Sequence, residues 1–186
     1  MKKISILLLI ICISCSTNDV DISKYPIVTT IKEVSKEYDI QVDLSGKSET
    51  SSLTKYLDGS IELEYTYDLI ETDFYTPLFY SITITKDKTI KDAKENYKLS
   101  NDALGLVVNS FGQGTEEVTN MDLPGDENYY ANRTYDGAPN GFLFSMREGV
   151  YSYSLIVSGI YMEDNSFIYD VILPEIQNLK DFDVIE

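Results

Sequence analysis

The chain has 186 residues and a formal net charge of −16, from 31 aspartate and glutamate residues against 15 lysine and arginine residues. Hydrophobic residues make up 43% of the sequence, which is enough for a sizeable core, since a chain near this length buries roughly 68–70% of its unfolded surface. The chain contains no histidine, which excludes serine–histidine and cysteine–histidine catalysis and histidine-ligated zinc. The composition therefore predicts one acidic globular domain and argues against a disordered chain.

The N-terminus has the pattern of a secretory signal peptide over residues 1–14. A basic start is followed by an apolar run at 4–13, too short to span a bilayer, and the small residue Ser14 then precedes Cys15. The order Cys-Ile-Ser-Cys resembles the bacterial lipobox, in which a small residue precedes the cysteine that receives the lipid, although Cys12 stands where an aliphatic residue is usual. The resemblance implies a bacterial lipoprotein with lipidated Cys15 as its mature N-terminus. The alternative is a plain signal peptide with incidental cysteines.

Cleavage before Cys15 leaves 172 residues, 13 basic against 31 acidic, and hence a net charge of −18. No free thiol remains, and the acidic surface argues against nucleic acid or anionic headgroups as partners, because both favour clustered lysine and arginine. Residues 15–37 are expected to form the lipidated cysteine, an acidic tether over about 16–23 and a short helix. By resemblance to lipoprotein sorting signals, Ser16 after the cysteine implies the outer membrane. Whether the domain faces the periplasm or the surface stays open.

The first half of the mature chain predicts a short helix and three strands. Near-helical spacing over 27–38 favours a helix, alternation over 38–44 a half-buried strand, and the polar stretch 45–52 a loop. The clearest strand is 61–68, where apolar and polar residues alternate strictly, and 79–85 follows as a strand rich in aromatic and β-branched residues.

The second half predicts a long helix, an antiparallel meander and a C-terminal helix. Thr89 and Asp92 resemble a capping box and open an apolar periodic run that ends at Gly112. Strands are expected at 129–135, 142–147 and 150–161, separated by turn-rich segments. Asn165 and Ser166 can cap a last amphipathic helix that Pro174 kinks or restarts, with its stripe packed on the meander strand that holds Leu155 and Val157.

These elements predict an α+β domain over residues 38–186, with a mostly antiparallel sheet of about six to seven strands, one long central helix and a C-terminal helix packed on it. The element order over 38–182, with the strand at 153–159 leading into an amphipathic last helix, resembles the PsbP and Mog1-like fold. That resemblance implies a binding or assembly module and supplies no site residue. A cystatin-like or other α+β sandwich is the alternative.

The carboxylates suggest two kinds of chemistry. Glu62 and Glu64 lie two apart on one strand face, and glycosidases use paired carboxylates as acid and base, but a solvated face explains the pair as well. Oxygen ligands for calcium gather around Gly125 and again at 163–165, without the spacing of a known calcium loop; those around Gly125 are Asp122, Asp126, Glu127 and Asn128. We therefore expect no catalytic residue, no metal and no cofactor.

The tyrosines are the strongest candidates for a binding surface. Tyr65 and Tyr67 share one strand face, and so do Tyr151 and Tyr153. Packing in the sheet is the ordinary role of such residues, but exposed tyrosines would suit glycan stacking or a protein interface. Arg147 is added to this candidate ligand or partner surface, although an arginine in so acidic a chain more often pairs with a local carboxylate.

The sequence thus favours a cell-envelope lipoprotein, attached to the membrane through its N-terminal lipid, that acts as a non-catalytic binding or assembly module for an envelope protein or a glycan. The alternative is a glycan-binding or glycan-processing accessory lipoprotein that uses exposed tyrosines and carboxylates. A calcium-dependent adhesion domain is the third hypothesis.

Overall fold

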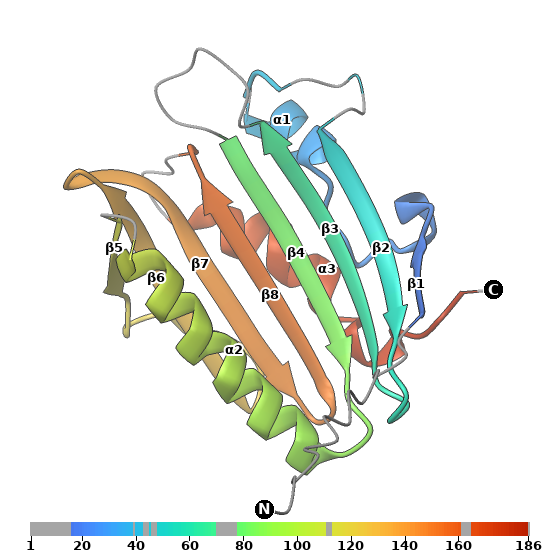
Figure 1. Cartoon of the computed structure of the whole chain (residues 1–186). Coiled ribbons are helices and arrows are strands. Elements are labelled where there is room, and N and C mark those ends of the chain that lie inside the picture. The colour runs from blue at the N-terminus through green and yellow to red at the C-terminus, as the bar shows by residue number, and fades with distance from the viewer. Residues whose placement is uncertain are drawn as a thin grey trace, which may run out of the picture.

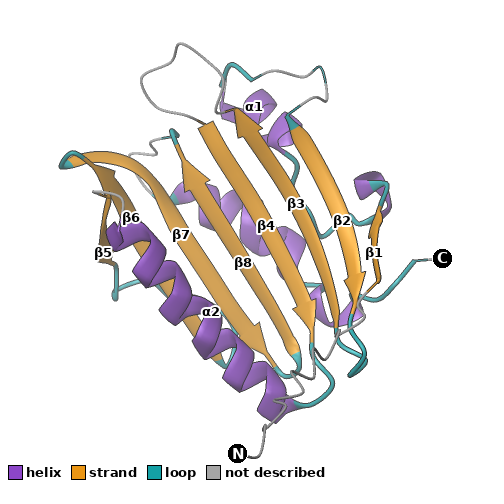
Figure 2. Ribbon diagram, in the orientation of Figure 1, coloured by secondary structure: helices purple, strands orange, loops and turns teal. Residues whose placement is uncertain are grey.

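The fold is one open antiparallel sheet of eight strands in the order β1-β2-β3-β4-β8-β7-β6-β5, with helices on both faces (Figures 1 and 2). The computed structural model describes residues 16–38, 40–42, 45, 48–69, 78–110, 113–160 and 165–185, without the side chains of 105–110 and 113. The predicted α+β class and antiparallel sheet are confirmed. The predicted strand count was too low, because three polar strands lack an alternating apolar pattern.

The bounds of the elements follow the chain. The strands are β1 (Ser16–Asp19), β2 (Glu49–Lys55), β3 (Ile61–Leu69), β4 (Leu78–Lys86), β5 (Gln113–Glu117), β6 (Glu127–Tyr135), β7 (Ala138–Glu148) and β8 (Tyr151–Ser158). The helices are α1 (Ile31–Tyr38), α2 (Ile90–Ser110) and α3 (Leu173–Ile176), together with the 3-10 turns η1 (Ile22–Lys24) and η3 (Leu179–Asp181) and the π-helical turn η2 (Ile168–Ile172).

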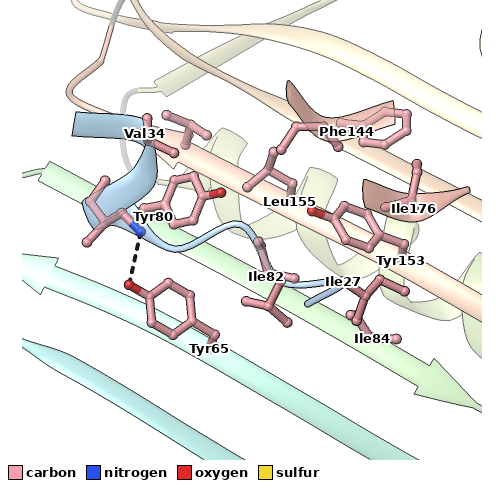
Figure 3. Close-up of a cluster of buried hydrophobic side chains, with 14 of the residues drawn as sticks. Ile27, Val34, Tyr65, Tyr80, Ile82, Ile84, Phe144, Tyr153, Leu155 and Ile176 are labelled. Atoms are coloured by element: carbon pink, nitrogen blue, oxygen red, sulfur yellow. Dashed lines mark hydrogen bonds between the residues drawn. The ribbon is translucent and has the colours of Figure 1, made fainter. Parts of the chain in front are cut away.

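The main core lies on one face of the sheet. Strict alternation in β3 sends Leu63, Tyr65 and Tyr67 to this face, and the pairing of β3 with β4 sets Tyr65 opposite Ile82 and Tyr67 opposite Tyr80. Figure 3 shows the tyrosine rings among the aliphatic side chains, with the Tyr65 hydroxyl accepting the N–H of Ile31 at 3.0 Å. This bond joins the start of α1 to the sheet.

The C-terminal segment covers the same face, as the sequence predicts. Its buried side chains belong to the core cluster that also holds Leu155 and Val157; they are Phe167, Ile168, Ile172, Ile176, Leu179 and Phe182. Helical backbone is continuous from Ser166 to Ile176 but changes type, with the π-helical turn η2 leading directly into α3, and η3 follows. Pro174 lies in the first turn of α3, directly after the π-helical turn η2, and it has no N–H to donate to the preceding turn.

The opposite face carries α2, which runs along β7 and contacts β5, β7 and β8 (Figure 2). The predicted capping box is confirmed, since the Asp92 N–H donates to Thr89 Oγ1 at 3.2 Å and the Thr89 hydroxyl donates to Asp92 Oδ2 at 2.7 Å. Ala93 is fully buried, and Tyr97 Oη lies 3.2 Å from Ser145 Oγ on β7. The sheet is therefore the middle of three layers.

Three expectations for the N-terminal region are wrong. No strand lies at 40–42, the described part of the stretch predicted as a strand, and β2 instead occupies much of the predicted loop at 45–52. The expected tether at 16–23 is also wrong, because β1 pairs with β2 from Ser16 opposite Lys55 onward and η1 follows. Polar strands of this kind form because neighbouring strands satisfy their backbone, whatever their own side chains prefer.

Candidate functional site

The predicted tyrosine surface is wrong for three of its four tyrosines. Tyr65, Tyr67 and Tyr153 have exposed fractions of 1%, 0% and 0%, because α1 and the C-terminal segment cover the face they share. Burial accordingly raises the pKa of Tyr65 and of Tyr153. Tyr151 is half-buried at the start of β8, with Lys86 Nζ 5.9 Å from its ring centroid. These tyrosines serve packing, and they give no exposed aromatic platform.

Arg147 is an internal partner of carboxylates and not part of an open surface. Its side chain is 2% exposed, and its guanidinium donates to Glu127, to Asp126 Oδ2 at 3.0 Å and to the Gly149 carbonyl at 2.8 Å. The pKa of Asp126 is lowered by the Gly149 N–H and then by Arg147. The expectation that an arginine here pairs with a local carboxylate is confirmed.

Three of the calcium candidates around Gly125 form contacts within the protein instead. Asp126 and Glu127 point to Arg147, and Asn128 Nδ2 donates to the Leu123 carbonyl at 3.1 Å. Within the part of the chain that the structure describes, no three acidic, histidine or cysteine side chains gather as metal ligands do. Glu163 and Asp164 of the second candidate lie outside the described residues, as does Cys15.

Glu62 and Glu64 lie on the same face of the sheet as α2, but on β3, away from the strands β5, β7 and β8 that α2 contacts. Glu62 accepts a hydrogen bond from Tyr56 Oη at 3.0 Å, and burial raises its pKa, whereas Glu64 is exposed. The side chains of Thr66 and Ser81 lie beside the glutamates, and Thr66 Oγ1 lies 2.9 Å from Ser81 Oγ. Neither glutamate lines the cavities described next.

An apolar cavity lies between two distant parts of the chain, and we name it the C-terminal groove. It is a cavity of about 180 Å³ lined by Tyr25, Pro26, Ile27, Glu175, Asn178, Asp181, Phe182, Asp183, Val184 and Ile185. Residues 25–27 enter the core ahead of α1, and the segment from α3 onward runs alongside them. Rings of Tyr25 and Phe182, with centroids 6.3 Å apart, contribute to its floor.

The rim of the C-terminal groove is acidic. Glu175, Asp181 and Asp183 are exposed, and Asp183 Oδ2 forms an ion pair with Lys86 Nζ at 2.8 Å. Ile185, which is 48% exposed, closes one side, and its N–H donates to Tyr25 Oη at 3.4 Å. The groove thus combines an apolar floor with carboxylates at its edge, which is how pockets fix both affinity and orientation.

A second, more polar cavity of about 300 Å³ adjoins the groove through Pro26 and Glu175. It lies between α1 and the C-terminal segment, and its further acidic side chains are Glu33, Glu37 and Asp170. Glu33 Oε2 accepts the N–H of Thr30 at 2.7 Å and so caps α1. The acidic rim therefore continues beyond the groove along one side of the molecule.

Comparison with protein-family models, with curated proteins and with solved structures gives no match. In the described ranges no helix has the length and apolar character needed to cross a bilayer.

Proposed function

We propose that the protein is a lipid-anchored protein of the cell envelope, held at the outer membrane through Cys15, that binds a protein partner in the C-terminal groove and performs no chemistry of its own. The lipobox resemblance at 12–15 supports the anchor. The observation that carries the binding role is the groove itself, an apolar floor with an acidic rim on a strongly acidic molecule.

The groove fits a partner segment that presents an apolar side chain next to lysine or arginine. The apolar side chain would cover Tyr25, Phe182 and Ile185, while the basic group would meet the rim. Asp183 is already paired with Lys86. Glu175 and Asp181 form no ion pair with any described residue, which leaves their charge for the partner.

The finer fold assignment belongs to the same proposal. An antiparallel sheet between α2 and the C-terminal segment is consistent with the PsbP and Mog1-like arrangement, whose members are mainly binding and assembly modules. A glycan-binding role would require an exposed aromatic platform. Tyr65, Tyr67 and Tyr153 lie in the core, so we favour a protein partner.

Metabolic labelling with a fatty acid tests the anchor. Cys15→Ala should abolish incorporation of the label, because the acceptor sulfur is gone, whereas Cys12→Ala should retain it, because Cys12 leaves with the signal peptide. Equal labelling of the Cys15→Ala variant and the natural chain would contradict lipidation at Cys15.

Site-specific photo-cross-linking in intact cells tests the groove. A photoreactive residue at Ile185 should give a discrete protein adduct, and the same residue at Tyr135, which is similarly exposed at 43% on β6, should not. Asp181→Lys should weaken the adduct by reversing one charge of the rim. An adduct of equal strength at both positions, unaffected by Asp181→Lys, would argue against the groove as the binding site.

A further inference from the structure

The sheet begins directly at the proposed lipid. Ser16, the first residue of β1, pairs with Lys55 at the end of β2. Consecutive Cα atoms are about 3.8 Å apart, so a lipid on Cys15 lies next to this pair with no spacer between them. The inference that follows rests on the lipidation of Cys15 proposed above.

The pairing of Ser16 with Lys55 identifies the end of the sheet that is nearest to Cys15 in the chain, and we name it the anchor end. Register partners run across it from Ser16 through Lys55, Ile61 and Lys86 to Tyr151. With strands about 4.8 Å apart, this row is about 19 Å wide. It is the lower edge of the sheet in Figure 1, where the arrows of β2 and β4 point and where α2 begins.

The connections at the anchor end expose large apolar side chains. Leu57, in the turn between β2 and β3, is 71% exposed, and Ile90, the first residue of α2, is 54% exposed. Asp58 of the same turn folds back, its Oδ1 accepting the Ser60 N–H at 2.9 Å. Leu57 therefore projects from a turn whose acidic group is already engaged.

Lysines lie near these apolar side chains, together with acidic residues. Lys55 and Lys88 are exposed, and Lys91 follows Ile90 on α2. Apolar side chains flanked by lysine suit the bilayer interface, where the apolar groups enter the headgroup region and the lysines meet phosphates. Acidic side chains lie at the same end, since Asp58 is exposed, Lys86 pairs with Asp183 and Lys91 pairs with Glu95. Contact with the bilayer therefore relies on the apolar side chains more than on charge.

We infer that the anchor end rests on the bilayer that holds the lipid, with Leu57 and Ile90 in the headgroup region and the sheet standing away from the membrane. The partner surface is the lipid bilayer itself. The turn between β6 and β7 then lies at the far end, because β7 runs from Ala138 to Glu148 and Glu148 pairs with Tyr151 at the anchor end. Ten steps along β7 correspond to about 34 Å.

The orientation also places the C-terminal groove near the membrane. The ion pair of Asp183 with Lys86 joins the rim of the groove to the anchor-end row. A partner would therefore bind in the groove close to the bilayer surface.

Fluorescence quenching of the lipidated protein tests this orientation. With Cys12 removed and Cys15 modified, an introduced cysteine is the only free thiol, so an environment-sensitive dye can be placed at Leu57→Cys or Ile90→Cys. Leu99→Cys on α2 is the matched control, since Leu99 is 68% exposed and lies about 13 Å further along the helix than Ile90. Tyr135→Cys reports the far end.

Each variant is reconstituted in vesicles of phosphatidylethanolamine and phosphatidylglycerol that contain spin-labelled lipid, after circular dichroism has shown native folding. We expect blue-shifted emission and at least about twofold stronger quenching at positions 57 and 90 than at 99 and 135. Equal quenching at all four positions, or none at 57 and 90, in protein that carries the fatty acid label would overturn the orientation and leave the anchor standing. Failure of the natural chain to take up the fatty acid would overturn the proposed anchor, and the orientation with it.

Discussion

Two buried tyrosines of the core allow the same chemical change to be made with opposite expected effects. Tyr80 and Tyr153 are both fully buried, and Figure 3 shows both rings in the same cluster. Tyr80 Oη donates to the Thr29 carbonyl at 2.8 Å. Tyr153 Oη has no hydrogen-bond partner among the described residues. Replacing each tyrosine by phenylalanine therefore removes a satisfied hydroxyl in one case and an unsatisfied hydroxyl in the other.

The magnitudes follow from these contacts. Tyr80→Phe leaves a buried carbonyl without this donor and should lower the free energy of unfolding by about 1–3 kcal/mol. Tyr153→Phe removes a polar group whose burial is not compensated, so it should cost nothing and can raise the free energy of unfolding by up to about 1–3 kcal/mol. Each kcal/mol moves the melting temperature of a domain of this size by roughly 2–4 °C.

Thermal and urea unfolding followed by far-ultraviolet circular dichroism measure the difference. Tyr153→Phe should melt at or above the temperature of the natural chain, and Tyr80→Phe clearly below it. Equal losses in the two variants would refute the reasoning, because they would show that ring packing and not the hydroxyl contact controls stability at both positions.

Three further predictions concern stability and catalysis. Ile172 is fully buried, so Ile172→Ala should lower the free energy of unfolding by about 2–5 kcal/mol. Ile185 is 48% exposed, so Ile185→Ala should change the free energy of unfolding by at most about 0.5 kcal/mol. Equal urea midpoints of the two variants would contradict the packing of the C-terminal segment. Burial raises the pKa of the Asp87 carboxyl above its model-peptide value of 3.8, so its contribution to stability is fully present below pH 3.8 and is lost as pH rises through the folded pKa. In urea unfolding at a series of pH values, Asp87→Asn should therefore lose less stability with rising pH than the natural chain. An unchanged pH profile would contradict the assignment. Glu62→Gln and Glu64→Gln should preserve folding and any partner binding, and loss of a hydrolytic activity in either variant with unchanged melting would overturn the non-catalytic proposal.

Elements with a local signal could be predicted from the sequence. The alternation from Ile61 to Tyr67 predicts β3, and the Thr89–Asp92 cap with its periodic run predicts α2, because each signal lies within the element itself. Strands β1, β2 and β5 are rich in serine, threonine and acidic residues. They are strands because neighbouring strands pair with them, and no local pattern carries that information.

The candidate site was missed for a related reason. Alternation shows that Tyr65 and Tyr67 share a face, but only the packing of α1 and the C-terminal segment shows that this face is covered. The C-terminal groove combines residues 25–27 with 175–185, two segments far apart in the chain. Neither segment carries a motif, so the groove exists only once the fold brings them together.

The outermost strands of the sheet influence how copies of the protein can crowd together. β1 has the sequence STND and β5 the sequence QGTEE, so both edges are short and polar, and β5 ends in two carboxylates. Short, polar and charged edges disfavour pairing with a strand of another molecule. Lipid anchoring would confine many copies to one plane, where collisions between sheet edges become frequent. These two edges would let the protein reach a high density on the membrane without aggregating strand to strand.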